Sequence, residues 1–172
     1  MKNIIVREAR PEDLAYIVVH LPDLCSASLH YIPMEEETLP LSAIIGPTRP
    51  RFPLSEITVN SHCLIAESQD EIIGILTCRG GRYAETRHIT VVEVFIGPDW
   101  MNQDIESRLM QEAIAWARET GVVKRLETRI LSTCDRTIDL YKKLGFEVEA
   151  ICRETALIED RFVDVVIMGL LL

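Results

Sequence analysis

The sequence predicts a single α/β domain built on a mixed β-sheet with helices on its faces. Alternating apolar stretches typical of strands come first, and a strand, helix, strand, helix, strand order follows. The chain has 172 residues, of which 48% are hydrophobic and 26% are charged, as in an ordinary globular domain. We therefore expect one domain over residues 1–172.

A strand and a helix are predicted at the start of the chain. Residues 4–9 (IIVREA) have the pattern of a short strand, and Pro11 with the acidic pair after it suits the first turn of a helix over residues 14–21. Six of the eight prolines lie within residues 22–53, so long regular helices are not expected there. The role of the Pro-rich segment 22–60 is not predicted.

A β-meander followed by a long helix is predicted in the middle of the chain. HCLIAESQDEIIGILTCRGG contains two strands around the polar turn at residues 68–71, and HITVVEVFI contains a third strand. From Ile105 apolar residues recur at helical spacing, and Gly121 stands where a left-handed C-terminal cap belongs.

The last third of the chain is predicted to contain a strand, a short helix and a closing hairpin. RLETRIL alternates as a strand does, and TIDLYKKLG forms a short helix that ends at Gly145. The hairpin turns at Glu159 and Asp160, and its final strand ends in VVIMGLLL. This apolar ending is typical of a core strand, although it also suggests a self-associating subunit.

Charge and cysteine usage exclude several classes of protein. A net charge of −9 with no basic run among aromatics disfavours nucleic acid and suits cationic amines as ligands. The five cysteines are widely spaced and the four histidines form no ligand pattern, which predicts a reduced, metal-free protein. The start of the chain is charged and no apolar run is long enough to span a membrane, so we expect a cytoplasmic protein with no membrane partner.

Four stretches carry a family resemblance. They are LIAESQDEIIGIL, VEVFIGPDW leading into LMQEAIAWARETGVVKRLETRI, RTIDLYKKLGFEVEAICRE, and RFVDVVIMGLLL. With their order they resemble the GNAT superfamily of N-acetyltransferases, in particular its phosphinothricin-like and ribosomal-protein N-terminal acetyltransferase branch. The resemblance implies the GNAT fold, with a mostly antiparallel sheet of about seven strands and helices on both faces, and a chain able to form a homodimer.

The resemblance also implies a reaction. An amine of a small molecule or peptide would attack the thioester of acetyl-CoA directly, and Tyr141 occupies the position of the general acid near the departing sulfur. A phenol suits that role because it stays protonated at neutral pH, although Tyr141 could simply pack as an aromatic side chain. Glu93 is the candidate base, and its alternative is a partly buried structural carboxylate on the strand face of Val91 and Phe95.

The loop before the long helix departs from the family pattern. Family members have Arg or Gln, any two residues, Gly, any residue, and Gly or Ala, whereas this chain has MNQDIE at residues 101–106. Glycine lets the backbone approach the pyrophosphate, which then binds the free N–H groups at the start of the helix. We expect the carboxylates of Asp104 and Glu106 to cap the helix instead. A carboxylate about 5 Å from a phosphate charge would cost roughly 3 kcal/mol of cofactor binding.

A second departure lies before the short helix, where the family's Asn is Cys134 and the following Ala is Thr137. We interpret Cys134 as a small buried thiol rather than a nucleophile, because the sequence places no His beside it. The resemblance still assigns a set of residues to acetyl-CoA binding. They are Val94, Phe95, Ile96, Met101, Asn102, Gln103, Asp104, Ile105, Glu106, Cys134, Arg136 and Lys143.

Two functions remain open on these observations. One is a working N-acetyltransferase that holds acetyl-CoA by hydrogen bonds from the splayed fourth and fifth strands to the pantetheine arm, contacts that need no particular side chains. The other is a catalytically degenerate GNAT-fold protein, which has weak or no acetyl-CoA binding and binds another small ligand or a protein partner. The altered loop motivates the second, while Tyr141 and the LYKKLGF segment favour the enzyme.

Overall fold

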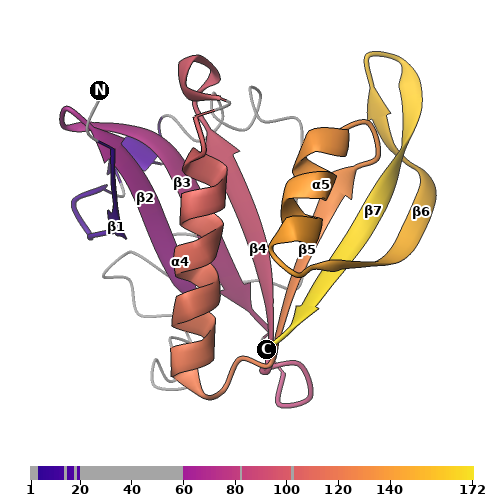
Figure 1. Cartoon of the computed structure of the whole chain (residues 1–172), viewed down its shortest axis with the longest axis horizontal. Helices are drawn as coiled ribbons and strands as arrows, with labels where there is room; N and C mark the ends of the chain where they lie inside the picture. Colours follow the sequence, from indigo (N-terminus) through magenta and orange to yellow (C-terminus); the bar gives the residue numbers. More distant parts are fainter. Residues whose placement is uncertain (1–3, 14, 18, 20–59, 82, 102) are drawn as a thin grey trace.

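The computed structural model describes residues 4–13, 15–17, 19, 60–81, 83–101 and 103–172 (Figure 1). They form a seven-stranded sheet in the order β1-β2-β3-β4-β5-β7-β6, which confirms the predicted fold class. The strands are β1 (Ile5–Glu8), β2 (His62–Ser68), β3 (Glu71–Gly80), β4 (Ile89–Ile96), β5 (Arg125–Leu131), β6 (Glu147–Ile158) and β7 (Arg161–Leu171). Between them lie the 3-10 helix η1 (Pro98–Trp100) and the helices α4 (Ile105–Thr120) and α5 (Asp135–Lys143).

The sheet is mixed in the way that the sequence predicts. The pair β4–β5 is parallel, and the other neighbouring pairs are antiparallel. Both predicted hairpin turns are confirmed, since Gln69 and Asp70 lead from β2 into β3, and Glu159 and Asp160 lead from β6 into β7. All four turn residues have positive φ, a conformation that tight two-residue hairpins require.

Apolar side chains cover both faces of the sheet. On the face that carries α4 and α5 (Figure 1), the larger core cluster joins one side of β4 to the buried face of α4. On the other face Ile17, from the described helical residues 15–17, packs with Phe95 and with buried side chains of β2 and β3. The predicted helix over residues 14–21 is thus confirmed where it is described, and the segment 22–59 lies outside the described residues.

The two helices after the meander differ slightly in how well they were predicted. α4 spans the predicted residues, and Gly121 ends it with a φ of 67° in the left-handed region. α5 begins at Asp135, two residues before the predicted start, because an acidic residue in the first turn complements the helix dipole. Among the residues that the structure describes, no helix is both long and apolar enough to cross a membrane.

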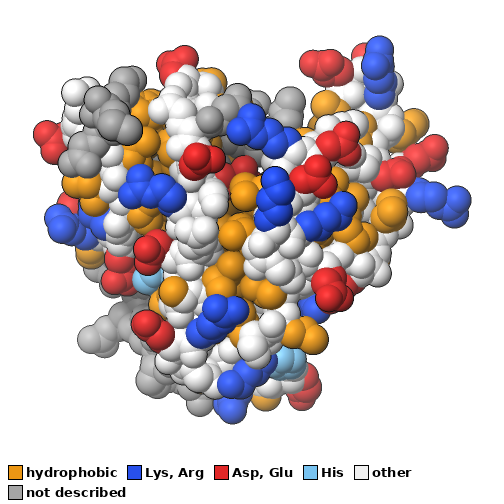
Figure 2. All heavy atoms as spheres, in the orientation of Figure 1, with side chains coloured by type: hydrophobic (Ala, Val, Ile, Leu, Met, Phe, Trp, Pro, Cys, Tyr) orange, Lys and Arg blue, Asp and Glu red, His pale blue; other side chains and the backbone are white. Residues whose placement is uncertain are grey.

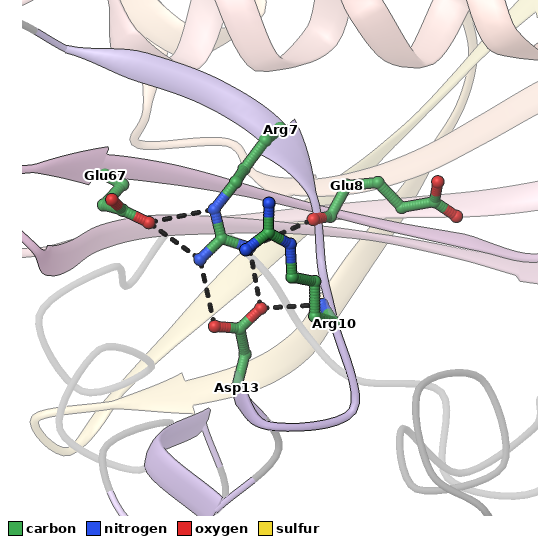
Figure 3. Close-up of polar contacts among 5 residues, drawn as sticks. All are labelled: Arg7, Glu8, Arg10, Asp13 and Glu67. Carbon is green, nitrogen blue, oxygen red and sulfur yellow. Dashed lines mark hydrogen bonds and ion pairs between the residues drawn. The ribbon is translucent and has the colours of Figure 1, made fainter.

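A cluster around Arg7 ties the first strand to the helical residues that follow it (Figure 3). The Arg7 guanidinium donates to both Asp13 carboxylate oxygens at 2.8 and 3.0 Å, and its Nε donates to Glu67 on β2 at 2.9 Å. Asp13 also accepts a hydrogen bond from the Arg10 backbone N–H at 2.7 Å. The hydrogen bond from Arg7 lowers the pKa of the Asp13 carboxyl. This cluster therefore favours the ionised form of Asp13 in the folded chain.

We expect Asp13→Asn to lower the free energy of unfolding at pH 7 by about 2 kcal/mol, because Arg7 loses a charged, paired acceptor. The folded-state pKa of Asp13 is depressed, so its contribution is present above the unfolded value of about 3.9 and is lost as the pH falls through the folded value. Urea unfolding at a series of pH values measures this. The exposed neighbour Glu12, changed to Gln, is the control, and an equal loss in both variants would contradict the assignment.

Candidate active site

The sheet opens in its middle, between the two parallel strands. β4 pairs with β5 through Ile89↔Arg125, Thr90↔Leu126 and Val91↔Glu127 only, yet both strands continue beyond these pairs. Figure 1 shows them diverging toward the end of the sheet where α4 begins. The ladder between β4 and β5 therefore ends at Val91 and Glu127, and the edges of the two strands beyond this point border an opening that suits an extended ligand with amide groups.

A cavity of about 780 Å³ lies at this open end, between the starts of α4 and α5. It is lined by the end of β4, the loop before α4, the first residues of α4, and the loop and first turns of α5. Acidic and basic side chains both gather over α4 and α5 on this face (Figure 2). The lining ions are Asp104, Glu106, Asp135, Asp139, Arg136 and Lys143.

The structure brings most of the predicted cofactor residues together around this cavity. Those that line it are Ile96, Met101, Gln103, Asp104, Ile105, Glu106, Cys134, Arg136 and Lys143. Val94 instead lines a small neighbouring cavity, and Phe95 packs on the opposite face of the sheet. Asn102 lies outside the described residues. Segments separated by about 30 residues in the sequence thus border one site, while their role in binding stays a prediction.

Asp104, at the start of α4, has a backbone conformation that the sequence of the loop did not predict. It occupies the N-cap with φ 57° and ψ 11°, in the left-handed region, and its exposed side chain makes no capping hydrogen bond. The prediction that this carboxylate caps the helix is therefore wrong. Aspartate is one of the few non-glycine residues that tolerate this conformation. The loop thus keeps a turn that suits glycine, and the Asp104 side chain does not occupy the N–H groups at the helix start, which is where anions bind to helices.

Glu106 also differs from its predicted role as a helix cap. Its half-buried side chain lines the large cavity and also the small one, and it forms a hydrogen bond with Tyr141 of α5. Burial raises the pKa of the Glu106 carboxyl, while the Tyr141 hydrogen bond and the charge of Arg136 oppose that rise. Sequence analysis missed this contact because nothing in a linear pattern shows that α5 packs against the start of α4.

Tyr141 is held in place by the end of its own helix. The Phe146 N–H donates to the Tyr141 carbonyl at 2.9 Å, and the Gly145 N–H donates to the Lys142 carbonyl at 3.0 Å. These two bonds form a Schellman cap, for which Gly145 adopts a φ of 97°. The cap brings the Phe146 ring to 5.3 Å from the Tyr141 ring. The LYKKLGF segment therefore holds Tyr141 in a fixed position at the end of α5. Tyr141 is only 2% exposed.

The small cavity connects Tyr141 to the opening in the sheet. Its volume is about 10 Å³, close to that of one water-sized probe, and it lies between Val94 of β4 and residues 128–130 of β5. Tyr141, Glu106 and Thr137 complete its lining. The phenol of Tyr141 thus lies beside the region where β4 and β5 separate, which is the placement that an acid acting on a ligand in the gap needs.

Glu93 lies on a different side of the sheet. Because strand side chains alternate between faces, Glu93 lies on the same face of β4 as Phe95, opposite the face of Val94 and α4. It is 4% exposed. The Thr77 hydroxyl donates to Glu93 Oε2 at 2.9 Å, and the Arg79 guanidinium forms an ion pair with Oε1. Among the described residues, Glu93 lines neither cavity. Its role as a base stays a prediction, and its partners also suit the structural alternative.

Cys134 precedes α5 as a half-buried thiol in the wall of the large cavity. Burial raises the pKa of this thiol, a hydrogen bond with Thr133 opposes the rise, and the charges of Glu106 and Asp135 add to it. A thiol in this environment stays protonated at neutral pH, and the thiolate is the reactive form. The interpretation of Cys134 as an unreactive thiol is consistent with this environment.

Comparison with known proteins identifies the class to which this site belongs. The profile of the Acetyltransferase (GNAT) family matches residues 28–146, and the chain belongs to that family. The L-amino acid N-acetyltransferase AaaT of Escherichia coli (strain K12) is 28% identical over 106 residues. That match covers 62% of this chain and 65% of the curated protein, so it spans less than two thirds of its relative.

Solved structures share the fold along nearly the whole chain. The acetyltransferase of the GNAT family from Streptococcus pneumoniae matches with a TM-score of 0.75 and 27% identity, covering 99% of both chains. YncA, described as an acetyltransferase from Salmonella typhimurium and solved with its cofactor acetyl-CoA, matches with a TM-score of 0.73 and 19% identity, covering 98% of this chain and 94% of that one. The resemblance to the GNAT superfamily is confirmed.

We expect Asp104→Gly to raise the free energy of unfolding by about 0.5–1 kcal/mol, because glycine adopts the left-handed N-cap without a Cβ clash. Gln103→Gly is the matched control, since Gln103 is exposed and is not among the residues with positive φ. Glycine there relieves no strain and adds freedom to the unfolded chain. Chemical unfolding of both variants measures the difference, and equal destabilisation would show that the loop is not held in this conformation.

Proposed function

We propose that the chain is an N-acetyltransferase that transfers the acetyl group of acetyl-CoA to the amine of a small molecule or peptide. The observation that carries the proposal is the opening between β4 and β5, which Tyr141 borders and which leads to the cavity at the start of α4. Such an opening suits a long, amide-containing thioester arm with a charged end. Family membership supports the same activity.

The donor set of the cavity fits this cofactor. The backbone of β4 beyond Val91 would bond the amides of the arm, while the N–H groups at the start of α4 and the side chains of Arg136 and Lys143 would bind the phosphates. The carboxylates of Asp104 and Glu106 oppose this binding. Asp104 is exposed and therefore screened by water, so Glu106 is the principal electrostatic cost.

Acetyl-CoA would supply the acetyl group as a thioester. In that chemistry the nitrogen of a neutral amine would attack the carbonyl carbon, so that a C–N bond would form and the C–S bond would break. Tyr141 Oη would donate its proton to the departing sulfur, which avoids release of a free thiolate, and the tyrosinate would regain a proton from solvent. The amine nitrogen then gives up its extra proton to Glu93 or to a water molecule.

L-amino acids are the first acceptors to test, since the curated relative is an L-amino acid N-acetyltransferase. The net charge of −9 is compatible with amines that reach the site as cations. We propose the cytoplasm as the place of action. The acceptor side of the site is expected on the face of the sheet that carries Glu93, opposite α4 and α5.

The direct test is a titration of the purified chain with acetyl-CoA, followed by release of free CoA thiol in the presence of an amine panel. A ligand that binds only the folded chain raises its melting temperature by mass action. We expect a saturable rise, and thiol release with at least one amine. No rise at millimolar acetyl-CoA would contradict the enzyme and leave a GNAT-fold protein that binds another ligand.

Tyr141→Phe is expected to lower kcat by about a hundredfold or more, because the sulfur loses its proton donor. The ring and its packing on Phe146 remain, so the melting shift with acetyl-CoA should persist. The same chemical change at the exposed Tyr83 is the control and should leave kcat as in the wild type. Full activity in Tyr141→Phe would assign the tyrosine to packing alone.

Glu93→Gln separates the two roles of this carboxylate. If Glu93 is the base, we expect kcat/KM to fall about a hundredfold near pH 7 and to recover as the pH rises, because hydroxide from the solvent can then take the proton from the nitrogen in place of Glu93. The variant should also lose stability, since Arg79 loses its charged partner. Thr77→Val removes only the hydroxyl partner and is the control. A loss of stability without any change in the pH profile of active protein would make Glu93 structural.

A further inference from the structure

Glu106 makes a contact that the proposed chemistry does not use. Its carboxyl group lies on the first turn of α4 and is hydrogen-bonded to the hydroxyl of Tyr141 on α5. No other acidic side chain lines both the large cavity and the small one, among the residues that the structure describes. One carboxyl group therefore borders both the phosphate end of the site and the proposed acid.

We propose that Glu106 is a positioning residue for Tyr141, and that binding of CoA to this chain requires the Glu106 carboxyl to take up a proton. The inference rests on the proposed function, because it concerns the same cavity and the same tyrosine. It goes beyond that function by giving Glu106, a residue of the altered loop, a role in cofactor binding and in the orientation of Tyr141.

The direction of the hydrogen bond decides what Tyr141 can do. An ionised Glu106 can only accept, so the Tyr141 proton is directed at the carboxylate and away from the gap between β4 and β5. A protonated Glu106 can donate to the phenol oxygen, and the Tyr141 O–H is then able to point toward a sulfur in the gap. Protonation of one carboxyl thus releases the Tyr141 proton from its hydrogen bond to Glu106.

The charge of the carboxyl acts in the same direction on the cofactor. A diphosphate at the start of α4 would lie near Glu106, and two like charges in a half-buried site disfavour the ionised carboxylate. A neutral Glu106 carboxyl would remove this repulsion, and the N–H groups at the start of α4 could still donate to the phosphates. Binding and protonation are therefore linked, and each favours the other.

The surroundings of Glu106 set the starting point of this linkage. The charged and titratable groups that line the two cavities with Glu106 are Asp135, Arg136, Asp139, Tyr141 and Lys143 from α5, Cys134 before that helix, Arg129 from β5, and Asp104 at the N-cap of α4. Burial raises the pKa of the Glu106 carboxyl, and Tyr141 and Arg136 limit that rise. A nearby phosphate would raise it further.

Calorimetric titration with CoA between pH 5.5 and pH 8 tests the proposal without any amine or turnover. In the wild type we expect the affinity to fall as the pH rises, by at most about tenfold per pH unit for one linked proton. Glu106→Gln should bind CoA more tightly at pH 8 and show a shallower dependence on pH. Titration of the CoA phosphates is common to both proteins, so the difference between them isolates Glu106.

Two further variants keep the test specific. Asp104→Asn removes a carboxylate from the same cavity, but one that is exposed and does not line the small cavity beside Tyr141, so it should retain the wild-type dependence on pH. Tyr141→Phe removes a hydrogen bond that lowers the pKa of Glu106, so its pH dependence should shift to higher pH rather than disappear. Repeating one titration in buffers of different ionisation enthalpy counts the protons taken up.

The outcomes distinguish this inference from the proposed function. If CoA binds and Glu106→Gln keeps the wild-type dependence on pH, the role of Glu106 is overturned while the acetyltransferase proposal stands. If neither protein binds CoA at any pH, both proposals are overturned. Loss of the pH dependence in Asp104→Asn as well as in Glu106→Gln would show general repulsion in the cavity and would overturn the positioning of Tyr141.

Discussion

The separation of β4 from β5 is the constraint on which the rest of the site depends. Each strand remains paired on its outer side, β4 with β3 and β5 with β7, so each half of the sheet is held by antiparallel ladders. The halves join through three parallel pairs at one end. The open end must then be bordered by side chains and helix ends, which is where the starts of α4 and α5 lie. The cavity is thus a consequence of how two stable halves meet.

The altered loop changes the chemistry of this opening more than its shape. Asp104 keeps a left-handed backbone at the start of α4, so the N–H groups of the helix remain oriented as an anion site needs. Glu106 points inward and bonds to Tyr141, so the new carboxylate lies beside the proposed acid rather than on the outside of the helix. A loop that departs from the family pattern therefore keeps a left-handed turn of the kind that glycine favours.

Much of the fold was predictable because its signals are local. Period-two and helical alternation placed the strands and α4, and polar pairs such as Glu159–Asp160 placed the turns. The boundary of α5 was predicted two residues too late, since its start depends on Asp135 in the first turn rather than on apolar spacing. Most of the predicted cofactor residues do border one cavity, whereas Phe95 faces the other side of the sheet, as strand alternation requires.

By itself the sequence determined the order of the elements and the family, and it placed Tyr141 on a short helix that ends at Gly145. These follow from contacts between near neighbours, such as the Schellman cap at Gly145, which the linear pattern encodes directly. Only the tertiary structure decided that Glu106 meets Tyr141, that Asp104 does not cap its helix, and that Glu93 is held by Thr77 and Arg79. The physical reason is that side-chain direction and pairing across elements depend on the packing of helices and strands that are distant in the chain.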